Sequence, residues 1–314
     1  MKILLAIDGS KGSHAVLQEA ITRKWPVDTT FCVLSIVDLN HWDGMPELIE
    51  DARHAANTLV QKAVAQMQAA GLNVVSEVRL GFPQRAINKY AAEWQANLIM
   101  VGSRGLSEIT RFLLGSVAQS VLRDAPCSVE IVRPPSPEAL AGLHTKILVA
   151  TDGSECSAKA VQAIANRPWA PGTEVRIVSA VQLAMPEIPS AWSPDNPQYP
   201  TGLLNEVWKE AEVRAHAAIA DARKTLEKAG LKISESHTPA IGEPRAVILD
   251  QASAWGANLI VVGSHGKHGL DRMLMGSVSE AVALHAHCSV EIFRTEAPKA
   301  AKQRPSELSL VGAA

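Results

Sequence analysis

The amino-acid sequence predicts an α/β protein that contains two copies of one domain, each built on a parallel β-sheet with helices on both faces. The opening phrase MKILLAIDGS of residues 1–10 returns as TKILVATDGS at 145–154, and NLIMVGSRG at 97–105 returns as NLIVVGSHG at 258–266. Short apolar runs alternate with amphipathic segments, which is the pattern of a doubly wound sheet. The 314 residues allow two domains of roughly 150 residues, each large enough to bury its own core.

The first copy opens with two strands that flank a helix. Residues 2–7 read KILLAI and residues 31–37 read FCVLSIV, and both are nearly continuous apolar runs. Such runs are expected of strands that are buried on both faces, as in a parallel sheet. Residues 13–24 carry apolar residues at three- and four-residue spacing, which predicts a helix with one buried face.

A long helix and three further strands complete the first copy. Residues 46–70 repeat apolar residues at helical spacing, and Gly71 suits the end of that helix. The remaining segments alternate in the same way: a strand at 73–80, a helix over 83–94, a strand at 97–102, a helix from Ser116 and a strand at 128–133. The order β-α-β-α-β-α-β-α-β predicts right-handed crossovers between parallel strands.

The ends of the repeats predict the domain boundaries. We expect one domain over residues 1–137 and a second over 144–297, joined by a short proline-rich linker. Residues 298–314 show no durable periodicity and are expected to form a disordered tail.

The second copy carries an inserted loop. Residues 182–202 contain five prolines and two large aromatic residues, where the first copy needs only residues 38–45. Prolines at that density prevent regular structure and stiffen the chain. The loop is interpreted either as a lid or partner-docking segment beside a ligand site, or as an inert insertion, because lengthening a surface loop costs little.

Composition narrows the class of ligand and the location. The 30 basic and 32 acidic residues leave a net charge of −2, so no positive field draws the protein to nucleic acid or to an anionic membrane. No apolar stretch approaches the ~20 residues of a membrane span, and Asp8 interrupts the opening run before it could serve as a signal peptide. The four cysteines form no CxxC pair and are expected to be reduced, buried thiols. We therefore expect a cytoplasmic protein that binds a small molecule or a protein partner.

An aspartate follows the first strand of each copy, Asp8 in the first and Asp152 in the second. Ligands of open parallel sheets bind at the carboxyl ends of the strands, where the strand order reverses. Each carboxylate could accept hydrogen bonds from a ribose. It could equally cap the next helix, together with a serine such as Ser10 or Ser13. The residues alone leave both interpretations open.

A glycine-rich loop follows the fourth strand of each copy with identical spacing. Glycine lets the backbone approach an oxyanion, and a Gly-Ser step that opens a helix offers N–H groups, a hydroxyl and the positive end of the helix dipole. The pattern is GxxG, nine residues and then GS in both copies, with its residues at Gly102, Arg104, Gly105, Gly115 and Ser116, and at Gly263, His265, Gly266, Gly276 and Ser277. It predicts a phosphate-binding loop in each copy.

At these motifs the chain resembles a tandem universal stress protein. The ATP-binding members of that family carry G-x2-G-x9-G-(S/T) after the fourth strand and an aspartate in a D-G-S phrase after the first. The resemblance covers residues 1–134 and 145–295 and includes the GxP phrases at 81–83 and 242–244. It implies a Rossmann-like, adenine nucleotide alpha hydrolase-like fold with five parallel strands in the order 3-2-1-4-5.

The resemblance further implies that each copy binds ATP with Mg²⁺. Adenine is expected near the ends of strands one and two, ribose at the aspartate and a magnesium-bound triphosphate on the loop. The implied ATP-binding residues are Asp8, Ile36, Gly102, Arg104, Gly105, Gly115 and Ser116 in the first copy, and Asp152, Ala180, Gly263, His265, Gly266, Gly276 and Ser277 in the second. The direct protein ligands of the metal stay unknown.

The last strands are expected to join the two copies. The segments 129–133 and 290–294 are apolar and would otherwise leave open sheet edges. The resemblance implies edge-to-edge contact at this strand and hence an intramolecular pseudo-dimer. A homodimer of the whole chain and an unidentified protein partner are also expected, since two-fold assembly is common.

The sequence offers little support for catalysis. It lacks a GxxxxGK[ST] loop, and DGSKGS and DGSECS lack the paired glycines of a PP-loop synthetase. His265 and His268 could assist proton transfer, or they could be solvated side chains that help to neutralise phosphate. We expect a nucleotide-responsive stress protein with weak or no ATP hydrolysis. An interaction scaffold that binds no nucleotide and an AMP or cyclic-AMP sensor are the alternatives.

Overall fold

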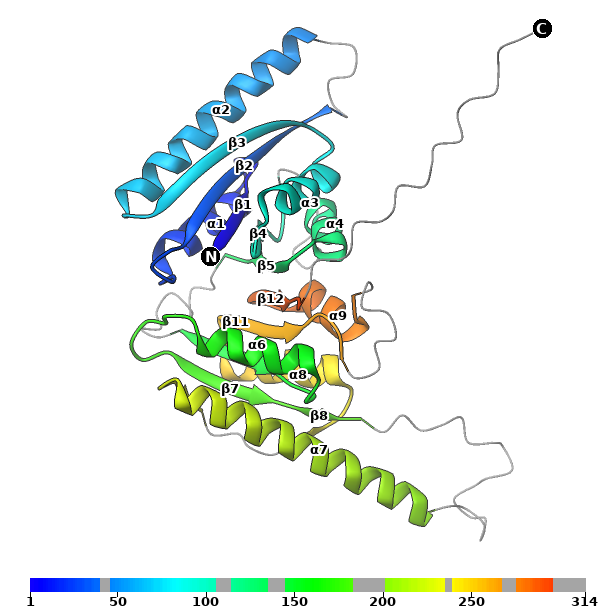
Figure 1. Cartoon of the computed structure of the whole chain (residues 1–314). Helices are drawn as coiled ribbons and strands as arrows, with labels where there is room; N and C mark the ends of the chain where they lie inside the picture. Colours follow the sequence, from blue (N-terminus) through cyan, green and yellow to red (C-terminus); the bar gives the residue numbers. More distant parts are fainter. Residues whose placement is uncertain are drawn as a thin grey trace, which may run out of the picture.

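The computed structural model describes residues 1–39, 46–105, 114–134, 145–182, 201–234, 239–266 and 275–295. Figure 1 shows two α/β units placed end to end along one sheet. The expected linker, most of the inserted loop, the expected disordered tail and His268 lie outside the described residues. None of the helices in the described ranges combines the length and apolarity that crossing a membrane would need.

The first repeat forms a parallel sheet with the order β3-β2-β1-β4-β5. This is the predicted order 3-2-1-4-5. Its strands are β1 (Lys2–Ala6), β2 (Thr30–Asp38), β3 (Asn73–Gly81), β4 (Leu98–Gly102) and β5 (Ser128–Val132). Its helices are α1 (Lys11–Thr22), α2 (Pro46–Ala69), α3 (Pro83–Trp94) and α4 (Ser116–Asp124).

The second repeat has the same order, β9-β7-β6-β11-β12. Its strands are β6 (Lys146–Ala150), β7 (Glu174–Val178), β9 (Lys232–Ile233), β11 (Leu259–Gly263) and β12 (Ser289–Phe293), with helices α6 (Glu155–Ala165), α7 (Thr201–Lys228), α8 (Pro244–Trp255) and α9 (Ser277–His285). Two short strands, β8 (Ala180–Val181) and β10 (Ala240–Ile241), form a separate parallel pair. The outer part of this repeat is therefore divided where the first repeat has one continuous pairing of β2 and β3.

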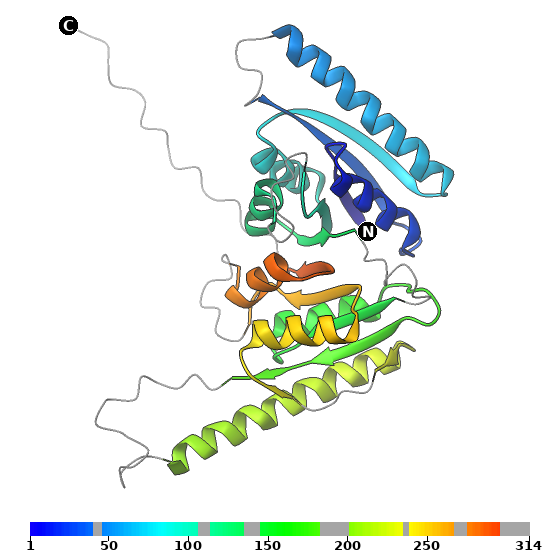
Figure 2. The ribbon, with the colours of Figure 1, turned by 180° about the vertical axis from the view of Figure 1, so that it is seen from behind.

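Helices cover both faces of the first sheet, which explains its unbroken apolar strands. Ile3 packs with Phe31 and Met67 in the core under α1 and α2, whereas Leu4 packs with Leu34 in the core under α3 and α4. In Figure 1 and Figure 2, α2 lies on one side of the first sheet and α3 and α4 lie on the other. Alternate residues of β1 thus bury on opposite faces.

One of the cores is continuous across both repeats. The buried cluster under α3 and α4 also contains residues that lie under α8 and α9, such as Leu148 and Ile292 beside Leu4 and Ile131. The cores under α1 and α2 and under α6 and α7 are separate clusters. The two repeats therefore share half of their packing and are not independent globules.

The repeats join through their last strands, as the sequence predicted for these edges. Strand β5 pairs with β12 in antiparallel register, with Glu130 opposite Glu291. Each glutamate is fully buried and receives two hydrogen bonds from an arginine of its own repeat. Arg23 donates to Glu130 over 2.6 and 2.7 Å, and Arg167 donates to Glu291 over 2.5 and 2.6 Å. Two carboxylates can face each other in this core because each has its own cation.

Candidate functional site

A pocket of about 800 Å³ opens in the second repeat, at the carboxyl ends of β6, β7 and β11. Its walls come from the turn after β6, the strand β8, helices α7 and α8, and the chain after β11. That volume is typical of small-molecule sites. The residues predicted in the second copy all line this pocket: Asp152, Ala180, Gly263, His265, Gly266, Gly276 and Ser277.

A tight turn presents the aspartate of each repeat. Ser10 N donates to Asp8 Oδ1 over 3.0 Å, and Ser154 N donates to Asp152 Oδ1 over 2.9 Å. The following glycines hold left-handed backbone angles, with φ of 81° in the first turn and 73° in the second. The helix cap itself is the serine, since Ser10 Oγ accepts from Ser13 N over 3.2 Å. Helix capping thus falls to the serine, and the aspartate orders the turn before it.

The second oxygen of each aspartate faces the glycine loop. A Cβ added to Gly105 would lie 2.7 Å from Asp8 Oδ2, and one added to Gly266 would lie 2.8 Å from Asp152 Oδ2. Any side chain at these two positions would therefore collide with the carboxylate. The structure brings the predicted aspartate and the second glycine of the motif into direct contact in both repeats.

The Gly-Ser steps open helices whose first turns have no side-chain cap. Gly115 is the N-cap of α4 and Gly276 the N-cap of α9, and neither helix has a capping side chain. Gly115 N donates to Ser103 O over 2.9 Å and Gly276 N to Ser264 O over 2.8 Å, which ties each helix start to its own glycine loop. The first turn of α9 lines the pocket. Uncapped N–H groups and the positive helix end make this a favourable place for an anion.

The opposite end of the pocket is apolar. Val178 at the end of β7, and Ala180 and Val181 just after it, line the pocket on the side of β6 away from β11 and its glycine loop. In the first repeat, Ile36 is the equivalent of Ala180, and it lies two residues beyond Leu34, whose carbonyl accepts from Ile7 N over 2.9 Å. An apolar wall opposite a polar, glycine-rich wall suits a ligand with a flat base at one end and charge at the other.

The glycine loop of the first repeat packs directly against helix α1. A Cβ on Gly12 would lie 2.2 Å from Arg104 O, and a Cβ on Gly102 would lie 2.7 Å from the backbone of Gly12. Ser10 Oγ also donates to Arg104 O over 3.4 Å. The predicted residues Gly102, Arg104 and Gly105 therefore sit over the start of α1, beside Asp8.

Several lining residues were missed by the sequence reasoning. Thr151, Ser157, Gln182 and Arg214 line the pocket of the second repeat as polar groups. A position-by-position comparison of the copies could have indicated Thr151 and Arg214, because the first copy has Ile7 and Ala55 at these positions.

The histidine of the second loop is held by a hydroxyl group. His265 Nδ1 lies 2.8 Å from Ser264 Oγ. A catalytic base would ordinarily be oriented by a carboxylate, and here the neighbour of Nδ1 is a serine. Both interpretations of His265, a proton-transfer group and a group that helps to neutralise phosphate, stay predictions.

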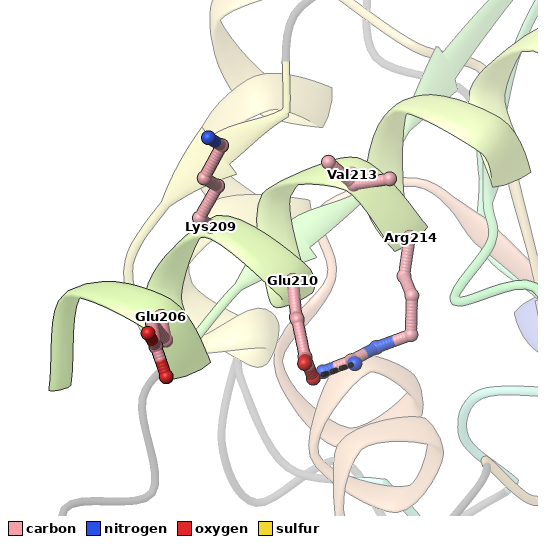
Figure 3. Close-up of a pocket in the computed structure, with 5 residues that line it drawn as sticks. All are labelled: Glu206, Lys209, Glu210, Val213 and Arg214. Carbon is pink, nitrogen blue, oxygen red and sulfur yellow. Dashed lines mark hydrogen bonds and ion pairs between the residues drawn. The ribbon is translucent and has the colours of Figure 1, made fainter. Parts of the chain in front are cut away.

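A second hollow lies along α7, next to the pocket of the second repeat, and Arg214 lines both. Figure 3 shows Glu206, Lys209, Glu210, Val213 and Arg214 along it, all from this one helix. Glu210 accepts from Arg214 over 3.3 Å, an i,i+4 pair in which both side chains are largely exposed. Such pairs belong to a solvated helix face. We assign no binding role to this hollow.

No cluster of three or more histidine, cysteine, aspartate or glutamate side chains suited to a metal ion occurs among the residues described. The donors near the glycine loop are one carboxylate and several hydroxyls. Mg²⁺ commonly binds through one or two carboxylates, phosphate oxygens and water. This donor set fits a magnesium ion that arrives with a nucleotide.

The cysteines are all free thiols, three of them buried and Cys127 half-buried. This agrees with the expectation of reduced cysteines. Trp94 and Trp255 pack against the shared core, and the ammonium groups of Lys2 and Lys146 lie 5.5 and 5.6 Å from their ring centroids. These tryptophans therefore have a packing role, as the sequence indicated.

The comparisons with known proteins agree with this arrangement. The sequence model of the universal stress protein family matches residues 1–133 and again residues 144–294. A universal stress protein of Mycolicibacterium smegmatis is 28% identical over 305 residues, which cover 93% of this chain and 96% of that protein. A universal stress protein of Mycobacterium tuberculosis is 28% identical over 297 residues, which cover 90% and 93%.

The solved structures point to the same fold. The crystal structure of a universal stress protein from Archaeoglobus fulgidus superposes with a TM-score of 0.61 at 21% identity, covering 94% of this chain and 96% of that one. This match at low identity shows the shared fold. Since the family model matches both repeats and nearly the whole described chain, the protein belongs to the universal stress protein family and carries two of its domains in tandem.

Proposed function

We propose that each repeat binds ATP with Mg²⁺ at the carboxyl edge of its sheet, and that the protein acts as a nucleotide-responsive module in the stress response. The observation that carries the proposal is the pocket of the second repeat. There a carboxylate, a glycine loop and the uncapped start of α9 converge on one side, and an apolar wall lies on the other.

The pocket suggests an orientation for the nucleotide. The base would lie against Ala180 and its apolar neighbours, and the ribose hydroxyls would donate to Asp152. The phosphates would lie between the glycine loop at 263–266 and the first turn of α9, where N–H groups and the helix dipole favour negative charge. The first repeat offers the same order of groups, from Ile36 through Asp8 to α4.

The pocket supports binding better than catalysis. Among the described residues that line it, the ionisable side chains are Asp152, His265 and Arg214. A lysine that bridges phosphates, as in P-loop enzymes, is not part of this set. We therefore propose weak or no ATP hydrolysis.

The assembly follows from the use of the sheet edges. Strands β5 and β12 pair with each other, so the sheet edge that joins the two repeats is already filled within one chain. A homodimer of the whole chain would therefore have to use another surface. We also propose that the chain signals through an unidentified protein partner. A cytoplasmic location is part of this proposal.

Calorimetry with purified protein tests the proposal directly. We expect two ATP sites in the wild type, one in Gly115→Val, one in Gly276→Val and none in the double variant, because a valine at the helix start would exclude the phosphate. Ala70→Val on the exposed end of the second helix is a matched control and should keep both sites. Absence of binding by the wild type would favour the scaffold, and tighter binding of AMP or cyclic AMP would favour the sensor.

A further inference from the structure

Two arginines cross the seam where β5 meets β12. Arg133 follows β5, and its guanidinium donates to Ala283 O over 2.6 Å and to Cys288 O over 3.1 Å in the second repeat. Arg294 follows β12, and it donates back to Leu122 O over 2.6 Å and to Arg123 O over 3.1 Å in the first. The side-chain hydrogen bonds of both arginines thus end on backbone carbonyls of the opposite repeat.

Three of these carbonyls, those of Leu122, Arg123 and Ala283, belong to the C-terminal ends of α4 and α9, and Cys288 O lies between α9 and β12. The last intrahelical-type bond of α4 runs from Ala125 N to Val121 O, which leaves the carbonyls of Leu122 and Arg123 for Arg294. Ala283 O has the equivalent place in α9. Helix ends expose unpaired carbonyls with partial negative charge, and a cation stabilises them. Each helix is therefore capped across the seam by the other repeat.

The same two helices begin at the candidate phosphate sites. Helix α4 starts at Ser116 and α9 at Ser277, and each contains nine residues, a rod of about 13 Å. A short helix moves as a unit, so the arginine at its C-terminal end helps to fix the N–H groups at its N-terminal end. In Figure 1, α4 and α9 lie beside the seam between β5 and β12.

The residue before each arginine is hydrogen-bonded to the glycine loop of its own repeat. Ser103 N donates to Val132 O over 2.9 Å, one residue before Arg133. Ser264 N donates to Phe293 O over 2.8 Å, one residue before Arg294. A continuous path of hydrogen bonds and rigid helix therefore runs from the glycine loop of one repeat to the phosphate-side helix of the other, in both directions.

The burial of these arginines indicates that they fill a specific role. Arg294 is 8% exposed, and its Nε is buried without a hydrogen-bond partner in the described structure. Burial lowers the pKa of Arg294, and it lowers the pKa of Arg133 to about 10. Keeping a charged guanidinium in such a place is unfavourable unless the carbonyls of the helix end compensate for the lost water.

We propose that Arg133 and Arg294 are positioning residues that act across the seam. Arg294 of the second repeat orients the nucleotide site of the first, and Arg133 of the first repeat orients that of the second. The inference rests on the proposed function, and it makes the two sites energetically coupled. Each site is complete only when the other repeat is docked against it.

Site-resolved affinities test the crossed pattern. In the Gly276→Val background, where only the first site binds, Arg294→Met should weaken ATP binding about tenfold, whereas Arg133→Met should change it less than about twofold. In the Gly115→Val background the two effects should exchange. Arg294→Lys and Arg133→Lys keep a cation at the helix end and should restore part of the affinity.

Arg123→Met is the matched control. Arg123 also crosses the seam, where its side chain donates to Glu280 over 3.2 Å, but it is largely exposed. Within the described residues its side chain makes no hydrogen bond to a helix-end carbonyl of the opposite repeat. It should leave both affinities unchanged. Equal loss at both sites in Arg294→Met would indicate general loosening of the seam and overturn the proposal, as would loss confined to the second site.

A measurement without nucleotide separates this inference from the proposed function. Amide hydrogen exchange in the ligand-free protein should be faster in α4 of Arg294→Met and in α9 of Arg133→Met, with the other helix unchanged. If this crossed pattern is present but the wild type binds no nucleotide, the arginines position the helices and the proposed ligand is wrong. Uncrossed or absent exchange differences would refute the positioning role, and the lysine variants provide the same test if the methionine variants fail to fold.

Discussion

The two repeats share a motif but support it differently. In the first, Gly12 lets the glycine loop pack onto α1, with Arg104 O at only 2.2 Å from where a Cβ would stand. In the second, Cys156 occupies that position, and its Sγ donates to Phe293 O over 3.4 Å. The second loop must therefore stand further from its helix. Identical spacing of glycines in a sequence does not ensure identical packing of the loops.

The hydrogen bonds around the two aspartates also differ between the repeats. Asp8 Oδ1 accepts a short hydrogen bond of 2.6 Å from Ser13 Oγ. The equivalent Ser157 Oγ donates instead to Ser154 O over 3.0 Å and lies 3.1 Å from Thr151 Oγ1. A threonine in the second copy thus draws the serine away from the aspartate. The duplicated site has kept its groups and changed their hydrogen bonds.

The largest difference in stability between equivalent variants of the two repeats should come from replacing the buried glutamates. Arg167 forms an ion pair with Glu291, whereas Arg23 forms ion pairs with both Glu130 and Glu19, each over 2.6 Å. Burial alone would lower the pKa of Arg23, but these two carboxylates hold it above its ordinary value. Removing one partner leaves a buried charge uncompensated. We expect Glu291→Ala to cost about 3–5 kcal/mol of unfolding free energy and Glu130→Ala clearly less. Urea denaturation of both variants measures the difference, and equal losses would contradict it.

The next test exchanges the residues that separate the two loops. Gly12→Cys would place a side chain against Arg104 O and should cost about 1–3 kcal/mol through overpacking. Cys156→Gly removes a thiol from a helix and should cost about 1 kcal/mol, because glycine is unfavourable there. Thermal unfolding measures both. A Gly12→Cys variant as stable as the wild type would contradict the closer packing of the first loop.

The strands could be predicted from the sequence because they depend on local patterns, and their order 3-2-1-4-5 could be predicted from the resemblance to the universal stress protein family. Continuous apolar runs such as residues 2–7 indicate buried parallel strands, and the glycine motif follows its strand directly. The side chains that cross the seam could not be predicted. Nothing in the sequence near Arg294 shows that its partners are Leu122 and Arg123, since that contact depends on the register of β5 and β12.

The division of the outer strands was also beyond the sequence. Strands β2 and β3 pair along nine positions, whereas β7 and β9 pair along two and the chain continues as the separate β8–β10 pair. Aligning the two copies shows where the second one has its insertion, but it does not show how the insertion changes the pairing of the outer strands. As a result, Ala180 belongs to a different sheet from the one that holds its counterpart Ile36.

A smaller test separates glycines that the fold requires from glycines that a ligand would require. Gly115 has φ of −63°, and its added Cβ would meet its nearest neighbour at 3.6 Å, so alanine fits the ligand-free structure. Gly115→Ala should change the free energy of unfolding by less than about 1 kcal/mol and still weaken ATP binding. Gly105→Ala should destabilise the fold, because its Cβ would lie 2.7 Å from Asp8 Oδ2.

Denaturant melts and calorimetry of the two variants measure the separation. The expected result is loss of affinity without loss of stability for Gly115→Ala, and loss of both for Gly105→Ala. Unchanged ATP affinity in Gly115→Ala would argue that phosphate does not approach this helix start. The equivalent pair in the second repeat, Gly276 and Gly266, should behave alike, although Gly276 has less room, with Ser264 O at 3.1 Å from its added Cβ.

A further effect should appear only at alkaline pH, and it should be similar for two cysteines. Burial raises the pKa of Cys127 and of Cys288 to about 12, against the opposing charges of Arg294 and Arg133. Both thiols stay neutral in the folded protein, whereas they ionise near pH 9 once unfolded. Above pH 9 the folded state therefore binds more protons than the unfolded state, and stability falls as pH rises from about 9 towards 12. Below pH 9 the thiols add no pH dependence.

Unfolding midpoints between pH 7 and pH 10.5 should fall less steeply in the Cys127→Ala, Cys288→Ala double variant than in the wild type, with each cysteine contributing about equally. A pH dependence carried by only one of the two cysteines would contradict the similar effect of burial on the two thiols, because burial is the main cause of both pKa shifts.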